Sequence, residues 1–341
     1  MFSSKKSEAL LANIRENRTL TRGEKLNLIV ELSIPSILAQ ITTVLMFFID
    51  ASMVGHLGTE ASASIGLVES TTWLLGSVTA AASMGFSVQV AHFIGANDFV
   101  KARQVFRHGL ICTLMLSVVI AFIALFIYQP LPFWLGGTSD IAHDASLYFL
   151  VFGLAMPFMQ LASLTGAMLK CSGNMHIPSV ISVGMCVMDV VFNYFFIYVL
   201  HLGVLGAAFG TATAFLIGSL LQAYFAIFRN KILALRQDHE PFRWMSNYVK
   251  NALKIGAPMA AQSILMSGAQ IVSIIIVAPL GKVAIAANTF AITAESLCYM
   301  PGYGIGEAAT TLVGQSVGAG RYDVCKSFAY MTVFLGMAVM S

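Results

Sequence analysis

The sequence predicts an all-α polytopic membrane protein, and three observations lead to that prediction. Of the 341 residues, 57% are apolar and only 10% are charged, whereas a soluble domain carries about 25% charged residues. The apolar residues form long stretches, and two of them, 109–128 and 146–169, contain no charged side chain. Nearly all Lys and Arg residues lie between alternate stretches. Stretches of this length favour helices over a β-barrel, whose strands alternate over about ten residues.

The first expected element is a polar N-terminal segment, 1–27. It lacks the short apolar core and cleavage site of a signal peptide, so it is expected to stay cytoplasmic. Nine apolar stretches follow, and they are predicted to cross about 30 Å of hydrocarbon as helices. Their expected ranges are 28–54, 61–94, 109–128, 146–169, 179–200, 203–228, 252–278, 283–312 and 327–341. The ninth stretch has 15 residues, or about 22 Å as a helix, which is short of the hydrocarbon thickness.

Basic residues predict the orientation. When the nine stretches are threaded with the N-terminus inside, 18 of the 19 Lys and Arg residues are cytoplasmic and only Lys282 is outside. This asymmetry is what the positive-inside rule requires. We therefore expect a protein integral to the plasma or inner membrane with a cytoplasmic N-terminus. The net charge of +3 is explained by orientation, and no nucleic-acid partner is expected.

An internal repeat predicts the domain organisation. At one constant offset along the chain, Leu57-Gly58 matches Leu280-Gly281 and Gly95-Ala96 matches Gly318-Ala319. The offset covers six helices, an even number, so the halves would be parallel repeats related by a pseudo-two-fold axis along the membrane normal. We expect two six-helix lobes with the second incomplete, as if truncated after about nine of twelve helices. The predicted units are the N-lobe 28–229, a cytoplasmic loop 230–249 and a partial C-lobe 250–341.

Acidic residues within the predicted spans indicate a site. They are Asp50, Glu69, Asp189, Glu295 and Glu307, and no Lys or Arg is expected at a depth where it could pair with them. The 1.5 Å rise per residue places Asp50, Glu69, Asn193 and Thr211 about 8–12 Å inside the outer ends of their helices, with Asp189 one turn deeper than Asn193. Unpaired charges at this depth are costly and are usually functional.

We therefore predict a cation-coupling site formed by Asp50, Asp189, Asn193 and Thr211. Carboxylate, amide and hydroxyl oxygens suit a hard cation such as sodium or an exchanged proton. Glu69 and Glu295 could form an additional polar site. Glu307 is expected near the inner interface, where solvation is easy and a functional role is not required. The alternative for all of these groups is hydrogen bonding between helices without a function.

Two helices contain candidate hinges. Pro157 lies within the fourth stretch, and a run that includes Pro301, Gly302 and Gly304 interrupts the eighth. Proline removes a helical hydrogen bond and glycine weakens a helix, so a bend or unwound point is expected at both places. Irregularities of this kind are also common in packed helices that do not move.

Motifs of soluble catalysis are absent from the sequence. It has no phosphate-binding G-x-x-x-x-G-K-[ST] loop, no H-E-x-x-H and no G-x-S-x-G. The five cysteines show no metal-ligand spacing, so they are expected to act as small apolar residues. We expect no enzymatic activity, no cofactor and no metal beyond a possible sodium ion at the coupling site.

Several phrases resemble the multidrug and toxic compound extrusion (MATE) transporters. They are Ile-Pro-Ser-Ile-Leu-Ala-Gln at 34–40, Met-Val-Gly-His-Leu-Gly at 53–58, Ala-His-Phe-Ile-Gly-Ala-Asn-Asp at 91–98, Asp-Val-Val-Phe-Asn-Tyr at 189–194, Gly-Val-Leu-Gly-Ala-Ala-Phe-Gly-Thr at 203–211 and Val-Gly-Gln-Ser-Val-Gly-Ala-Gly at 313–320. The resemblance implies two six-helix lobes and antiport of organic cations and drugs, driven by sodium or protons. It also implies an N-lobe cation site at Asp50, Asp189, Asn193 and Thr211. Many relatives have Asn before Asp in the fifth helix, whereas Asp189 precedes Asn193 here, and this reversed order could change the coupling ion.

Other functions remain open from the sequence. A flippase for lipid-linked substrates shares the architecture of the broader superfamily, but it would need a cationic cavity. An intramembrane enzyme would need a nucleophile or a metal set, and a channel would lack strict coupling. We expect a monomer whose partners are the lipid bilayer and small organic, often cationic, substrates. The 341-residue chain is expected to be inactive as a transporter until three further helices are appended.

Overall fold

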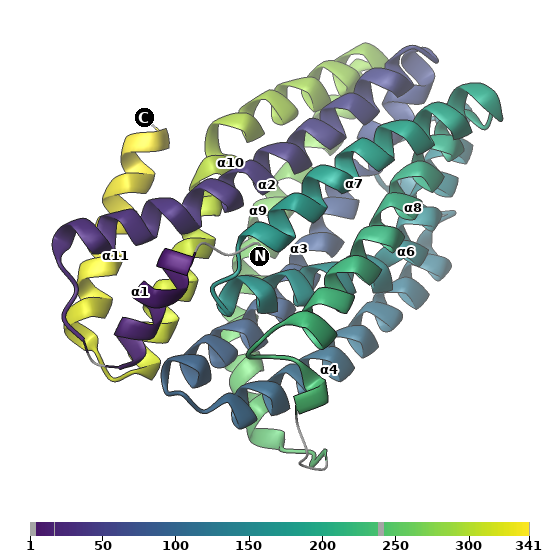
Figure 1. The fold of residues 1–341 in the computed structure, drawn as a ribbon. Coiled ribbons are helices and arrows are strands. Elements are labelled where there is room, and N and C mark those ends of the chain that lie inside the picture. Colours follow the sequence, from purple (N-terminus) through teal and green to yellow (C-terminus); the bar gives the residue numbers. More distant parts are fainter. Residues whose placement is uncertain (1–4, 17, 238–241, 341) are drawn as a thin grey trace.

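The computed structural model describes residues 5–16, 18–237 and 242–340, and this part of the chain is helical without any strand (Figure 1). Eight of the described helices are long and apolar enough to cross a membrane, and a bent helix, α10, makes a ninth. The prediction of an all-α polytopic membrane protein is confirmed.

The helices are longer than the apolar stretches that predict them. Six belong to the predicted N-lobe: α2 (Arg22–Gly55), α3 (Thr59–Gly95), α4 (Phe99–Ile127), α6 (Ser139–Cys171), α7 (His176–Tyr194) and α8 (Gly203–Tyr224). The last two continue as π-helical turns, Phe195–Val199 and Phe225–Arg229. Three more follow as α9 (Ser246–Val277), α10 (Lys282–Gly318) and α11 (Tyr322–Met340). Short helices are α1 (Lys5–Arg15) and α5 (Leu131–Trp134), with 3₁₀ turns at Leu235–Gln237 and Ala278–Leu280.

Capping explains why α2 begins six residues before its predicted start. The Thr21 hydroxyl accepts the backbone N–H of Glu24 at 3.3 Å, and the Glu24 carboxylate accepts the backbone N–H of Thr21 at 2.8 Å. This capping box satisfies N–H groups at the helix start, so the helix extends into polar sequence.

The ninth span also begins earlier than predicted. Helix α11 has 19 residues, or about 28 Å, and it is a candidate membrane span by length and composition, so the prediction that this span is too short was wrong.

The N-terminal segment contains a helix that the sequence analysis did not predict. In α1, the side chains of Leu10, Leu11 and Ile14 are buried. They join a cluster with Leu28 of α2 and Phe328 of α11. Figure 1 shows α1 beside α11 at one end of the molecule. The segment 1–27 is therefore not simply polar, because an amphipathic helix attaches it to the bundle.

Helix boundaries follow the internal repeat. The offset that matches Leu57 with Leu280 also carries both ends of α3 onto those of α10, and the start of α4 onto the start of α11. The residues that precede α3 and α10, Gly58 and Gly281, have φ values of 125° and 102°. Only glycine adopts these values without strain. The matched Leu-Gly pairs of the sequence thus begin equivalent helices.

Reciprocal contacts relate the two repeats. A Cβ added to Gly95 of α3 would clash with the carbonyl oxygen of Gln315, and a Cβ added to Gly318 of α10 would clash with that of His92. His92 and Gln315 are themselves matched positions of the internal repeat. Helix α2 packs on α10, while α9 packs on α3. Exchange of equivalent contacts is the signature of a two-fold relation, here between α3 and α10.

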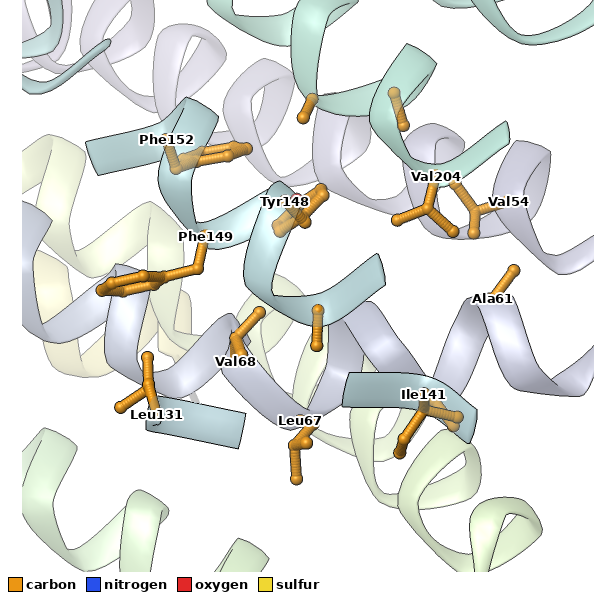
Figure 2. Close-up of a cluster of buried hydrophobic side chains, with 14 of the residues drawn as sticks. Val54, Ala61, Leu67, Val68, Leu131, Ile141, Tyr148, Phe149, Phe152 and Val204 are labelled. Atoms are coloured by element: carbon orange, nitrogen blue, oxygen red, sulfur yellow. The ribbon is translucent and has the colours of Figure 1, made fainter. Parts of the chain in front are cut away.

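A buried apolar cluster supports the predicted outer half of the first six helices (Figure 2). It centres on α6 and α3, where Phe149 and Leu67 are fully buried. Val54 of α2 and Val204 of α8 close it on one side. Helix α8 packs directly on α6, and contacts of this kind fix the rotation of each helix about its own axis.

The candidate hinges differ in structure. Helix α6 continues through Pro157 without a break. In α10, the run Pro301 to Gly306 stays helical, so of the two predicted alternatives, a bend or an unwound point, the structure shows a bend just before this run. The bend is 43° and lies between Ser296 and Cys298. This is one turn before Pro301, because a proline ring clashes with the carbonyl four residues earlier, here that of Leu297.

Candidate functional site

Three helices bring four predicted residues into contact. Asn193 Nδ2 of α7 donates to Asp50 Oδ1 of α2 at 2.5 Å and to Asp189 Oδ2 at 3.2 Å. The hydroxyl of Thr211, on α8, donates to Asp50 Oδ2 at 3.2 Å. We call these four residues the acid cluster. They come from positions up to 161 residues apart in the chain.

Local geometry explains the arrangement. Asp189 and Asn193 are four residues apart on α7, so their side chains share one face of the helix. Helix α8 approaches this face at Gly210, where an added Cβ would overlap the side-chain oxygen of Asn193. A second close approach follows at Gly206, where a Cβ would lie 2.9 Å from backbone atoms of Phe196. The two glycines therefore let α8 bring Thr211 to the carboxylates.

The acid cluster is buried and lacks a basic partner. Asp189 and Asn193 are fully buried, Thr211 is 2% exposed and Asp50 is 8% exposed. Among the described residues, no Lys or Arg lies within ion-pair distance of either carboxylate. Two buried negative charges held by neutral donors are costly unless a positive charge binds there. The arrangement therefore suits reversible binding of a proton or a cation.

Two oxygen atoms remain available for such a ligand. Asp189 Oδ1 and Asn193 Oδ1 are buried and have no hydrogen-bond partner among the described residues. Together with the oxygens of Asp50 and Thr211, they form the oxygen-only donor set that a hard cation prefers. Across the described part of the chain, no group of three or more His, Cys, Asp or Glu residues could hold a metal ion. A sodium ion would thus use amide and hydroxyl oxygens beside the two carboxylates.

Aromatic side chains lie on the α6 side of the acid cluster. Tyr148 of α6 is 7% exposed, stacks on Phe152 with ring centroids 4.9 Å apart, and lies within electrostatic range of Asp50, Glu69 and Asp189. The space beside Thr211, lined by Phe152 and Phe215, is too narrow for a water molecule. Figure 2 shows the Tyr148 and Phe152 rings in the packed core of α6. The cluster is therefore closed to water on this side.

The other predicted polar residues lie outside the acid cluster. Glu69 accepts a hydrogen bond from Trp73, one turn along α3, and makes no bond to the cluster. Glu295 is exposed on α10. Glu307 corrects an expectation, because Lys170 Nζ lies 2.6 Å from Glu307 Oε1. The prediction that no basic residue pairs with the intramembrane acids was wrong here, because helix packing brings the end of α6 against α10.

Other residues near the sites were not found from the sequence. Tyr148 gives no signal beyond being one aromatic residue in an apolar helix. Gly210 directly precedes Thr211 and could have been noticed as a small residue beside a polar one. Lys170 is the one basic residue that follows the fourth predicted span, and this isolated position gives no indication of its partner on α10.

Comparison with known proteins identifies the fold. The MatE family profile matches residues 35–195 and 258–341. Among solved structures, an outward-facing multidrug resistance MATE family transporter of the MOP superfamily has a TM-score of 0.85 at 24% identity, over 99% of this chain and 72% of that one. A MOP superfamily transporter from Pyrococcus furiosus, whose reversed pocket polarity suggests a different function for it, has a TM-score of 0.84 at 23% identity, with the same coverage.

Curated relatives are transporters. The chain is 25% identical over 299 residues to the "Probable multidrug resistance protein NorM" of Thermotoga maritima, over 86% of this chain and 64% of that protein. It is 22% identical over 300 residues to the "FAD transporter" of Shewanella oneidensis, over 86% of this chain and 65% of that protein. The chain thus spans slightly less than two thirds of the length of these relatives.

Proposed function

The chain belongs to the MatE family of membrane transporters, and from this premise we propose that it serves as a secondary active antiporter. It would export organic cations, drugs or other toxic compounds in exchange for protons or sodium ions. The observation that carries the proposal is the acid cluster, in which two buried carboxylates share Asn193 as donor and have no basic partner among the described residues.

Ion binding would be coupled to helix packing. Asp50, Asp189 and Thr211 lie on three different helices, α2, α7 and α8. Neutralising the two carboxylates favours close packing of these helices, and losing the bound charge restores repulsion within a dry site. The equilibrium between two arrangements of the lobe then depends on the ion, which is the requirement for coupled exchange.

The names of the relatives support the substrate class. Several are called multidrug resistance proteins, including the Thermotoga protein and one from Burkholderia vietnamiensis that is 27% identical over 324 residues. Because the Shewanella relative is called a FAD transporter, FAD is a necessary comparison substrate. A hydrophobic dye cation such as ethidium is the first substrate to test.

Protons are expected to drive export more effectively than sodium. The amide nitrogen of Asn193 lies between the two carboxylates and donates to both. The Asn193 amide nitrogen therefore already bridges the two carboxylates, and a sodium ion shared by both would have to displace it. A proton needs only one carboxylate oxygen. Proteoliposomes carrying the protein, expressed from its complete gene, should export ethidium when a pH gradient is imposed at equal sodium on both sides.

A sodium gradient at fixed pH is the matched condition. It should drive export at less than about a tenth of the rate given by the pH gradient, which corresponds to a preference of roughly 1.4 kcal/mol. Export that follows sodium and ignores pH would assign the acid cluster to sodium. Export that follows neither gradient would refute the antiporter.

A further inference from the structure

A second polar cavity lies apart from the acid cluster. Its volume is about 200 Å³, and it lies where α3, α6, α7 and α8 meet α10. We call it the inner chamber, because the predicted topology places it near the cytoplasmic ends of these helices. It shares no lining residue with the acid cluster. Its polar lining consists of Ser83, Ser163, Lys170, Ser182, Gln222 and Glu307.

An ion pair crosses between the repeats at this chamber. Lys170 of α6 and Glu307 of α10 are 2.6 Å apart, with side chains 18% and 26% exposed. Gln40 Nε2 of α2 also donates to Glu307 Oε1, at 3.2 Å. Both bonds use the same carboxylate oxygen. The other, Glu307 Oε2, is buried and has no hydrogen-bond partner among the described residues.

Other side chains that line the inner chamber also offer hydrogen-bond acceptors. Gln222 is 5% exposed, and its Oε1 is buried without a described partner. Gly166 keeps this oxygen uncovered, since a Cβ there would lie 3.0 Å from it. The Ser163 hydroxyl donates its proton to Ser83, so the Ser163 oxygen can only accept a further hydrogen bond. Buried acceptors without donors are costly, and a ligand rich in N–H groups would satisfy them.

We infer that the inner chamber binds the protonated amine of a transported substrate, and that this ammonium group competes with Lys170 for the charge of Glu307. The inference rests on the proposed export of organic cations. The substrate N–H groups would bond to Glu307 Oε2 and Gln222 Oε1. The carboxylate would then be shared between two cations, and the contact between α6 and α10 would weaken. Substrate recognition would thereby loosen the inner contact between the repeats.

The size of the chamber limits what it holds. Pockets for whole drug-sized ligands measure about 300–1,000 Å³, so 200 Å³ accommodates one cationic head. Benzylammonium is a suitable probe because it has one ammonium group and one small ring. Benzyltrimethylammonium keeps the charge but has no N–H group, and benzoate reverses the charge.

Two substitutions should change binding in opposite directions. In the purified chain in lipid nanodiscs at pH 8, Glu307→Gln should weaken benzylammonium binding by about tenfold, the effect of losing one charged hydrogen bond. Lys170→Met should instead tighten binding by several-fold, because it removes the competing cation while Gln40 still bonds to Glu307. Binding is measured by equilibrium dialysis of radiolabelled benzylamine. Misfolding would weaken binding in both variants, so it cannot produce this opposite pattern.

Further comparisons test the position and chemistry. Gly166→Ala should weaken binding by covering Gln222 Oε1, and benzyltrimethylammonium should bind more weakly than benzylammonium. The inference is overturned if Lys170→Met and Glu307→Gln both weaken binding, if neither changes it, if the parental chain binds no benzylammonium, or if benzoate is preferred. Asp50→Asn separates this inference from the proposed function, since it should stop export and keep the benzylammonium pattern. Export without that pattern would refute the inner chamber alone, and the pattern without export would refute the antiporter alone.

Discussion

Asp50→Asn and Asp189→Asn are each expected to abolish gradient-driven export while the protein still folds and inserts. Asparagine has nearly the same shape as aspartate, and its oxygen can still accept a bond from Thr211 or Asn193, which are the present donors. What is lost is the charge that binds a proton or cation. Coupling free energies are typically 1–3 kcal/mol, so losing the coupling should lower gradient-driven export by at least about tenfold, towards the background of liposomes without the protein.

Ethidium export from proteoliposomes under a combined pH and sodium gradient measures this effect. Asp323→Asn is the matched control, because the Asp323 side chain is 73% exposed and lies at the start of α11, away from the acid cluster. It should export at the parental rate. If Asp50→Asn and Asp189→Asn also export at that rate, the acid cluster is structural and the coupling assignment is wrong.

Gly95→Val and Gly318→Val should each destabilise the protein strongly. Each side chain would press on a backbone carbonyl of the facing helix, that of Gln315 or of His92. A backbone atom in a packed helix cannot move aside as a flexible side chain can, so overpacking should cost about 3 kcal/mol or more. The midpoint of thermal unfolding in detergent should fall by about 5 °C or more.

Gly76→Val is the control for the same substitution. It lies on α3 as Gly95 does, but a Cβ there would have no heavy atom within 4 Å. It should therefore lower the midpoint much less. Equal losses at Gly76 and Gly95 would show that helix propensity explains the effect, and that α3 and α10 do not form the reciprocal contact.

The residues of the acid cluster could be predicted because depth and helical spacing are properties of the sequence. Asp189 and Asn193 share a face at any helix rotation, since they are four residues apart. Polar residues at one depth on the helices of a single lobe tend to contact each other, because lipid and the apolar core offer them no hydrogen bonds. The structure brings Asp50 and Thr211 to them, as that reasoning expected. Their role in coupling stays a prediction.

Helix ends and contacts between repeats were less predictable. Hydropathy detects the segment that fits hydrocarbon, whereas α2 extends beyond it through the capping box at Thr21. The pairing of Lys170 with Glu307 depends on how α6 and α10 are rotated and placed. The rotation and placement of a helix depend on its packing against segments far apart in the chain. The depth of a residue along a single helix gives no information about that packing.

The most direct test of the proposed antiport is uphill ion movement driven by substrate. Ethidium is placed on one side of proteoliposomes at equal pH and equal sodium, and internal pH and sodium are followed with dyes. Because coupling is reciprocal, ethidium flux is expected to move protons in the opposite direction. Asp50→Asn and Asp189→Asn should each stop this movement. Ethidium flux that moves no ion, or ion movement that survives both substitutions, would contradict the proposed antiport.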